Sequence, residues 1–375
     1  MSLITAHAIY TMNVALPPYV FCLSLVPAAV WPAPQHVQCT PTTPGGTIAT
    51  RLAIKLTGNG ASSTVASNAA TRYTPLLTEH ATAGGKVAAI TVAVETDDEL
   101  LGQDTDYSYT IASSHGGVEV TARSPFGVAY ALETLSQFIG DDGALACADL
   151  AVDDAPVFVH RGIMIDTGRR FYPVALVKQT IDGMAMTKQN VLHFHLSEEC
   201  FRVQSLTYPQ LTASCVNGAG NNTASYTHED IADIVGYARW RGVRVLPEFD
   251  MPGHSGGFCS SLASAGIKCC GNQIEDDPNG ASVKIIAAVL TEMSGLFADK
   301  VMNLGCDETG SSAPCSLANT KSFEEKMIAH LIALGKTPMG WEEILFKTGA
   351  AAAYPTTIID SWASSSWAQA AAAGL

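Results

Sequence analysis

From residue 157 onward, short apolar runs of strand length alternate with longer stretches that carry an apolar stripe at helical spacing. In the clearest helical stretch, Thr227 and Asp230 form a capping-box signal ahead of one apolar stripe, made of Ile231, Ile234, Val235 and Ala238. Ser322 with Glu325 predicts the start of another helix. The expected strands are Gly162–Thr167, Val191–Leu196, Val243–Phe249, Val301–Asp307, Pro338–Ile344 and Thr357–Trp362. This alternation predicts βαβ units on a parallel sheet.

Six strand-helix units with polar residues after the strands predict a (β/α)8 barrel whose active face lies at the carboxyl ends of the strands. Such a barrel closes with eight strands, and six fit before Leu375. The expected fold is therefore α/β, with a TIM-type barrel over residues 156–375 that is truncated after about six units. Either the sequence is a truncated product, or the last strands come from elsewhere. The alanine-rich segment 367–375 is expected to form the helix after the sixth strand.

Residues 31–155 have a different texture, in which short β-like runs alternate with turn clusters. The runs are Ala89–Val94, Tyr107–Ile111 and Gly117–Ala122, and one helical pattern covers Gly127–Phe138. We expect a small α+β domain that precedes the barrel.

The first 50 residues contain no Asp, Glu, Lys or Arg, and the segment from Val14 to Val30 is mostly apolar. This pattern predicts a secretory signal peptide over residues 1–30. Pro17, Pro18 and Pro27 break or kink helices, so a stable membrane anchor is not expected.

Composition narrows the class of partner. The 375 residues are 47% hydrophobic and carry 21 basic against 35 acidic side chains, for a net charge of -14. That apolar content supports a large core. Without a run of Lys and Arg to neutralise phosphates, nucleic acid is a poor partner, and a neutral ligand rich in hydroxyl groups fits better.

Ten cysteines are present, of which Cys22 falls in the expected signal peptide. Nine then remain, and an odd number implies at least one free thiol or an intermolecular bond. They lack paired C-x-x-C spacing, and 221–223 is an N-glycosylation sequon. These features favour an oxidising compartment, namely the secretory pathway with an extracellular, lysosomal or vacuolar destination.

Adjacent carboxylates, Asp307 and Glu308, end the fourth expected strand of the barrel. Mutual repulsion of such a pair raises one pKa and leaves an acid beside an anion. Other strands also end in polar sets, which are Asp166 with Arg169, His193 and His195 with Glu198 and Glu199, Glu248 and Asp250 with His254, Trp341 with Glu342 and Glu343, and Asp360 with Trp362.

Several of these segments read as known motifs. They are HRGIMIDTGRRF at 160–171, NVLHFHLSEE at 190–199, VLPEFDMPGHS at 245–255, the 307–308 pair, Gly-Trp-Glu at 340–342 and the late Trp362. Together, and in this order, they resemble glycoside hydrolase family 20, the β-N-acetylhexosaminidases. The resemblance runs from about Val30 to the end, because Trp31–Pro32 and the 127–137 helix resemble the family's N-terminal domain.

The resemblance implies retaining, substrate-assisted hydrolysis of terminal, non-reducing N-acetylglucosamine or N-acetylgalactosamine residues from glycans, without a cofactor. Asp307 then orients the 2-acetamido group, which is the nucleophile, and Glu308 is the general acid and base. Trp341 and Trp362 are implied to wall the acetamide pocket, and Arg161 to bind a sugar hydroxyl.

The resemblance also places His254 near the acid, with Asp250 and Glu198 forming a second charged layer. It further implies that Cys269 or Cys270 pairs with Cys315, and that the protein forms a homodimer. The pair Glu198–Glu199 replaces the family's more usual aspartates, and Cys306 replaces a common glycine.

Two alternatives remain open. His193 and His195 lie on one side of a strand, as in a metal-dependent barrel hydrolase, but after His254 the sequence holds a single histidine, His330, within an expected helix. The other alternative is an inactive or carbohydrate-binding relative, because the last barrel strands are missing.

Overall fold

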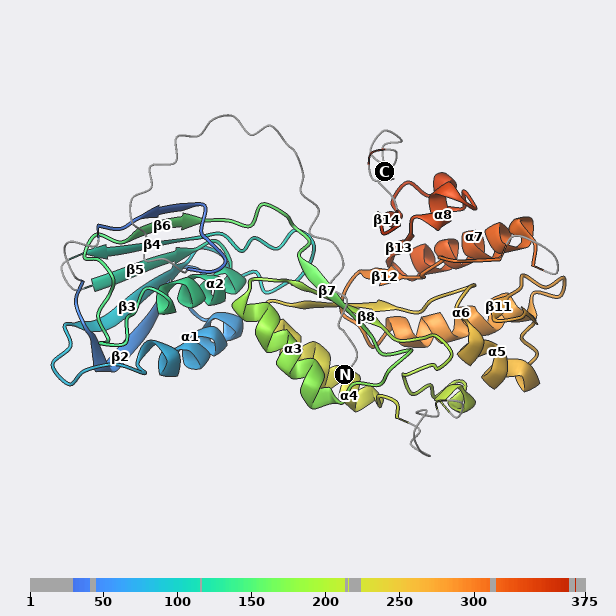
Figure 1. Ribbon diagram of the computed structural model, residues 1–375, viewed down its shortest axis with the longest axis horizontal. Coiled ribbons are helices and arrows are strands. Elements are labelled where there is room, and N and C mark those ends of the chain that lie inside the picture. Colours follow the sequence, from blue (N-terminus) through green and yellow to red (C-terminus); the bar gives the residue numbers. More distant parts are fainter. Residues whose placement is uncertain are drawn as a thin grey trace.

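The computed structural model of the chain contains two separate sheets with their own hydrophobic cores. Figure 1 shows the two parts side by side along the long axis, the earlier part in blue to green and the later part in green to red. The structure describes residues 30–40, 45–114, 117–212, 215, 224–310, 315–363 and 368. The expected signal segment before residue 30, the sequon at 221–223 and most of the alanine-rich segment lie outside the described residues.

The first sheet has six strands in the order β1-β6-β4-β5-β3-β2, with two helices on one face (Figure 1). The strands are β1 (His36–Gln38), β2 (Ile48–Thr57), β3 (Val87–Val94), β4 (Tyr109–Ser114), β5 (Gly117–Ala122) and β6 (Ala151–Asp154), and the helices are α1 (Thr64–Leu77) and α2 (Pro125–Ser136). Alternate residues of β5 are buried, as expected for a strand with one covered face. The three predicted strands and the predicted helix are present, and β1, β2, β6 and α1 were not predicted.

The second sheet is parallel and has its six strands in chain order, from β7 at one edge to β14 at the other. The strands are β7 (Gly162–Asp166), β8 (Val191–His195), β9 (Arg244–Glu248), β12 (Val301–Asn303), β13 (Thr337–Trp341) and β14 (Ile358–Asp360). Every residue of β8 and β9 is buried, which is typical of inner strands in a parallel sheet. All six predicted strands are confirmed, although each is shorter than expected.

Helices connect these strands and cover the parallel sheet. They are α3 (Val174–Met186), α4 (His228–Arg239), α5 (Gly256–Leu262), α6 (Ala281–Ser294), α7 (Leu317–Ala333) and α8 (Glu343–Phe346), and a short hairpin of β10 (Cys269–Cys270) and β11 (Gln273–Ile274) lies between α5 and α6. The capping box at Thr227 and Asp230 is confirmed at the start of α4. The start predicted at Ser322 is wrong, because Ser316 caps α7 by accepting from the Asn319 amide. The Ser322 hydroxyl instead donates to Asp276, 2.6 Å away.

Four disulfides join eight of the nine cysteines that follow residue 30. The pairs are Cys39–Cys147, Cys200–Cys215, Cys259–Cys269 and Cys270–Cys315, which leaves Cys306 as a free, buried thiol. The odd count therefore reflects one unpaired thiol. Between the two alternatives for Cys315, the structure selects Cys270.

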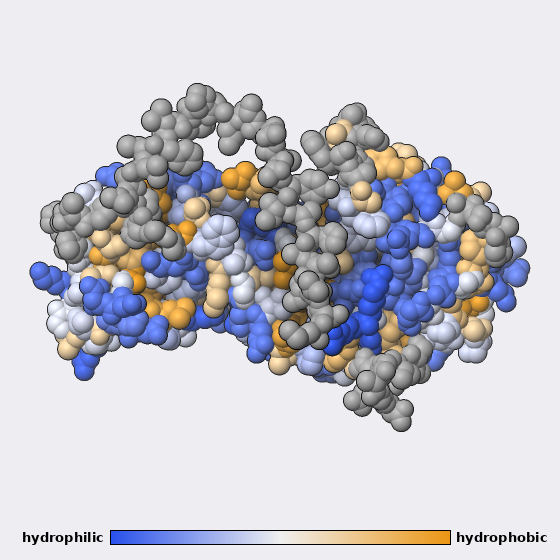
Figure 2. Space-filling view, viewed as in Figure 1, coloured by the Kyte–Doolittle hydropathy of each residue, from blue (hydrophilic) through white to orange (hydrophobic). Residues whose placement is uncertain are grey.

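Hydrophilic and hydrophobic residues are interspersed on the face shown in Figure 2. Among the described residues, no helix combines the length and the apolar content that a membrane crossing requires.

Candidate active site

The carboxyl ends of the parallel strands carry the polar residues that the sequence singled out. Asp307 and Glu308 follow β12 on a tight loop in which Gly305, Cys306 and Glu308 all have positive φ, at 72°, 73° and 48°. A Cβ added at Gly305 would lie 1.9 Å from Oδ1 of Asp250. Glycine therefore allows the loop to pack directly on this buried carboxyl.

His254 brings the two adjacent carboxylates together. Its Nε2 atom lies 3.2 Å from Oε2 of Glu308 and 3.6 Å from Oδ2 of Asp307. The side chain of Asp307 is 16% exposed and that of Glu308 is 58% exposed. One carboxylate is thus sheltered while its neighbour is open to a ligand, as a pair with two different tasks requires.

The other imidazole nitrogen of His254, Nδ1, lies 3.1 Å from Oε2 of Glu198. This contact with Glu198 is the main cause of the raised pKa of His254, which therefore favours the imidazolium form. Burial alone would raise the pKa of Glu198, but its close contacts with His195 and His254 lower it to about 2. Glu199, the second member of the Glu-Glu pair, turns away and accepts from Nδ2 of Asn272 at 2.7 Å.

Asp250 is fully enclosed behind Asp307 and accepts a hydrogen bond from the backbone amide of Cys306 at 3.2 Å. Burial, followed by the charge of Asp307, raises the pKa of Asp250 well above its usual range. Burial also raises the pKa of Asp307, while its hydrogen bond with Asp250 and the charge of His254 act in the opposite direction. We conclude that Asp250 holds the proton of this pair, so that Asp307 is the anion.

Trp341 lies at the end of β13 with its indole held against the strand ends. Its Nε1 donates to Oε1 of Glu248 at 2.9 Å, and its ring stacks on His193 with 5.5 Å between the centroids. Trp362, after β14, is 49% exposed, and its Nε1 donates to Oε2 of Glu343 at 3.1 Å. Trp341 thus contacts the buried side chains of Glu248 and His193, whereas Trp362 lies nearer the surface.

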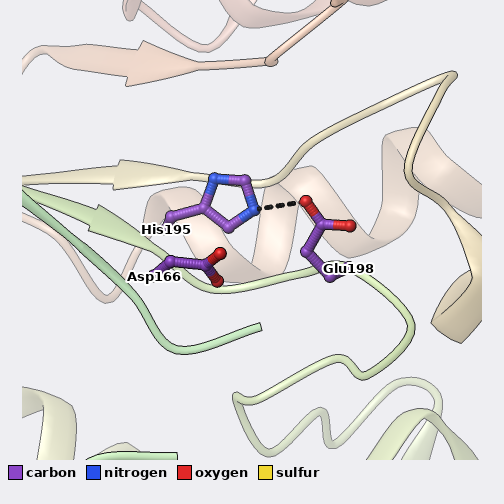
Figure 3. A group of neighbouring side chains, drawn as sticks. All are labelled: Asp166, His195 and Glu198. Atoms are coloured by element: carbon purple, nitrogen blue, oxygen red, sulfur yellow. Dashed lines mark ion pairs between the residues drawn. The ribbon is translucent and has the colours of Figure 1, made fainter. Parts of the chain in front are cut away.

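Asp166, His195 and Glu198 point toward one another in Figure 3, and their oxygen and nitrogen atoms are close enough to hold a metal ion. Arg169 already lies between the two carboxylates, with Nη1 2.6 Å from Oδ2 of Asp166 and Nη2 2.8 Å from Oε1 of Glu198. The guanidinium thus supplies the positive charge that these carboxylates require. His193 and His195 do lie on one side of β8, as predicted, but both face Glu248. These contacts favour a network of ion pairs between side chains over a metal site.

Two family models match successive parts of the chain. Residues 158–375 match "Glycosyl hydrolase family 20, catalytic domain", and residues 28–155 match "Glycosyl hydrolase family 20, domain 2". The chain belongs to glycoside hydrolase family 20.

Curated relatives and solved structures agree with this membership. The chain is 28% identical to beta-hexosaminidase 1 of Arabidopsis thaliana, over 90% of this chain and 69% of the relative. It is 30% identical to the human beta-hexosaminidase subunit beta, over 70% of this chain and 51% of that subunit. A chitobiase structure from Flavobacterium johnsoniae aligns with a TM-score of 0.75 at 25% identity, covering 89% of this chain and 55% of the chitobiase. The chain thus spans about half the length of the human subunit and of the chitobiase.

The structure does not support the family 20 role predicted for Arg161. Its guanidinium donates to the backbone oxygen of Lys188 at 2.9 Å and to the Tyr130 hydroxyl at 2.9 Å. These contacts lie at the amino end of β7, at the junction with the first sheet, whereas Asp166 ends the strand on the active face. Arg161 therefore lies at the end of β7 opposite to Asp166, and its role in sugar binding stays a prediction.

Arg169 is the residue that sequence reasoning left without a role. It contacts Asp166 and Glu198 at the carboxyl end of β7, where 56% of its side chain is exposed. The sequence did indicate a role for Arg169. It lies three residues after Asp166, the last residue of the strand, and barrel enzymes bind their ligands at this end of the strands.

Proposed function

We propose that this chain carries the catalytic centre of a β-N-acetylhexosaminidase, EC 3.2.1.52, which hydrolyses terminal, non-reducing N-acetylhexosamine residues. The observation that carries the proposal is the joint contact of His254 with sheltered Asp307 and open Glu308. Family membership supports the same reaction, and the relatives from Arabidopsis and human are described as beta-hexosaminidases. N-acetylglucosamine and N-acetylgalactosamine are the substrate units, and no cofactor enters the proposed reaction.

In the proposed reaction the carbonyl oxygen of the sugar's 2-acetamido group attacks the anomeric carbon, while the bond to the leaving oxygen breaks. Asp307 accepts the amide N–H, orients the acetamide and stabilises the positive charge of the cyclic intermediate. Glu308 gives its proton to the leaving oxygen, then takes a proton from the water that opens the intermediate. The sheltered position of Asp307 and the open position of Glu308 suit these two tasks.

Three further side chains are proposed to bind the sugar. Arg169 replaces Arg161 as the donor to sugar hydroxyls, because its partly exposed guanidinium lies at the active face. Trp341 supplies an apolar wall for the acetamide, and Trp362 is kept as a second wall at the end of β14. Asp250 and Glu198 act behind this layer by setting the charges of Asp307 and His254.

The wider organisation forms part of the proposal. Residues 31–155 are proposed as the α+β domain and residues 156–375 as the catalytic domain, whose six parallel strands belong to a (β/α)8 barrel. Four disulfides support a secretory route, with an extracellular, lysosomal or vacuolar destination. A homodimer is proposed as well, and light scattering of the purified protein tests it.

Hydrolysis of p-nitrophenyl N-acetyl-β-D-glucosaminide by the purified full protein tests the function. Glu308→Gln is expected to remove most turnover, and Asp307→Asn to impair it, with circular dichroism as the check on folding. Undiminished activity of folded Glu308→Gln would reject the assignment. Binding of N-acetylglucosamine without turnover would favour the carbohydrate-binding alternative, and loss of activity with a chelator would favour the metal-dependent one.

A further inference from the structure

Five ionisable side chains form a continuous line from the core of the parallel sheet to the exposed acid Glu308. The contacts are Glu248 Oε2 to His195 Nδ1 at 3.2 Å, His195 Nε2 to Glu198 Oε1 at 3.2 Å, Glu198 Oε2 to His254 Nδ1 at 3.1 Å, and His254 Nε2 to Glu308 Oε2 at 3.2 Å. Carboxyl groups and imidazoles alternate along the whole line, so each imidazole lies between two carboxyl groups.

Glu248 is the inner end of this line, and its side chain is 0% exposed. Its second oxygen, Oε1, accepts the indole N–H of Trp341 at 2.9 Å. Its Oε2 atom also contacts His193. A single carboxylate at the end of β9 therefore contacts side chains on β8 and on β13.

Burying such a carboxylate is expensive in free energy. The desolvation penalty of a buried ion is several kcal/mol, and well-packed apolar side chains often give equal or greater stability. The charge at position 248 therefore calls for an explanation other than stability. Its position explains the charge: Glu248 contacts Trp341 on one side, and on the other side it begins the line of contacts that ends at Glu308.

We propose that Glu248 is a positioning residue for the hydrolysis proposed above: it orients the Trp341 indole directly and holds His254 beside Glu308 through His195 and Glu198. The inference rests on the proposed function. Neither Glu248 nor His195 touches the sugar in this scheme, because both are buried behind the residues that do.

The charges around His195 explain how the line is held. Burial alone would lower the pKa of His195, but Glu248 and Glu198 outweigh it, and the pKa rises to about 11. Asp250 also faces this imidazole, and Asp166 lies within the same cluster. His195 is thus an imidazolium at neutral pH that keeps the Glu198 carboxylate in place.

The surroundings of Glu248 complete the set of charged groups. His195 and His193 on β8 both lower the pKa of Glu248 against the effect of burial, so the carboxylate stays ionised. Asp360 on β14 also faces this cluster, and burial raises its pKa. Without the charge of Glu248 the pKa of His195 would fall, and the imidazolium that contacts Glu198 would be less favoured.

Glu248→Gln is the first test, because the amide keeps the shape and an oxygen that accepts from the Trp341 indole, while the charge is lost. We expect kcat for the aryl glycoside to fall about tenfold or more, as for other hydrogen-bonded outer partners, with KM changed by less than about threefold. The pH profile of kcat should also shift, and the His195 ring signals in NMR should titrate at lower pH than in the unchanged protein.

His195→Gln and His193→Gln form a matched pair that decides the question if Glu248→Gln does not fold. Both histidines contact Glu248, but His195 lies on the line to Glu308, while His193 lies under the Trp341 indole. His195→Gln should lower kcat and shift its pH profile. His193→Gln should raise KM more than it lowers kcat.

Unchanged kcat and an unchanged pH profile in folded Glu248→Gln or folded His195→Gln would overturn the inference. The unchanged protein and Glu308→Gln are assayed in parallel. Absence of turnover by the unchanged protein would reject the proposed function itself, whereas an active protein with unaffected variants would reject the role of Glu248 alone.

Discussion

Arg161 and Arg169 lie beyond opposite ends of the same strand, β7, and they serve different parts of the molecule. Arg161 donates to the backbone of Lys188 and to the Tyr130 hydroxyl of α2, whereas Arg169 contacts Asp166 and Glu198 at the carboxyl end of β7. Two arginines eight residues apart in the sequence are thus separated by the length of a strand.

This arrangement predicts different effects for two equivalent substitutions. Arg169→Gln should lower kcat/KM for the aryl glycoside about tenfold or more, because it removes a charged partner of Glu198 and a proposed sugar donor. Arg161→Gln should lower the free energy of unfolding by about 1 kcal/mol or more, with kcat/KM within about threefold of the unchanged protein. Kinetics and thermal unfolding of both variants test the contrast, and the reverse result would restore Arg161 to the site.

Gly305 is predicted to be essential for the geometry of the loop that carries the two carboxylates. An alanine there combines a positive φ of 72° with a Cβ only 1.9 Å from Asp250, so the loop has to move. Gly305→Ala should lower both kcat and the free energy of unfolding. The free energy should fall by about 2 kcal/mol or more, as for other substitutions that strain a packed core.

Gly335 provides the matched control, because its φ of 74° is similar but an added Cβ meets nothing within 4 Å. Gly335→Ala should lower the unfolding free energy by about 1 kcal/mol and leave kcat unchanged. Equal effects of the two alanines on kcat would contradict this reasoning.

Glu324 predicts a pH-dependent stability that is independent of the reaction. Burial raises its pKa to about 8, although a hydrogen bond from Thr348 opposes the rise. A carboxyl with a raised pKa favours the folded state below its unfolded pKa, near 4.5, and this contribution is lost as pH rises through 8. Glu324→Gln should therefore have a higher free energy of unfolding than the unchanged protein above pH 8, and the difference should grow as pH rises through the pKa of Glu324.

The next residue of α7, Glu325, is the control for this effect. Its carboxylate lies 3.8 Å from the Lys321 ammonium on the exposed side of the helix. Glu325→Gln should change the unfolding free energy by less than about 0.5 kcal/mol, with little dependence on pH. Chemical denaturation of both variants and of the unchanged protein, at steps of about one pH unit from about pH 5 to about pH 9, measures these differences in unfolding free energy. A flat difference between Glu324→Gln and the unchanged protein would refute the prediction.

The Cys270–Cys315 disulfide is predicted to matter for activity as well as stability. It ties the chain that follows Glu308 to the β10–β11 hairpin, where Gln273 also accepts from the Gly310 amide at 2.7 Å. Replacing both cysteines by alanine should lower the unfolding free energy by about 2 to 4 kcal/mol and should also lower kcat.

Replacing Cys39 and Cys147 by alanine is the comparison for this disulfide. That bond lies in the hydrophobic core of the first sheet and its helices, and its loss should affect stability by a similar amount without changing kcat. Activities are compared well below the unfolding temperature of each variant. If both double variants lose kcat equally, the effect is one of stability alone.

Local patterns in the sequence determined the parallel sheet and the place of the adjacent carboxyl groups of Asp307 and Glu308. The six strands of the second sheet and the capping box of α4 follow from apolar spacing and from side chains three residues apart. Asp307 and Glu308 are neighbours in the chain, so their proximity needed no tertiary information. The start of α7 was missed because Ser316 and Ser322 are both acceptable caps, and the long-range bond of Ser322 to Asp276 decides between them.

Tertiary structure decided which distant residues meet. Glu248 and Trp341 are 93 positions apart and share a hydrogen bond, because parallel pairing places the ends of β9 and β13 at the same edge of the sheet. The contacts of Arg161 with Lys188 and Tyr130, and the choice of Cys270 over Cys269 for Cys315, are likewise contacts between distant parts of the chain. The spacing of apolar residues along the chain shows which face of one helix or strand is buried. Contacts between elements arise only when all the elements pack together.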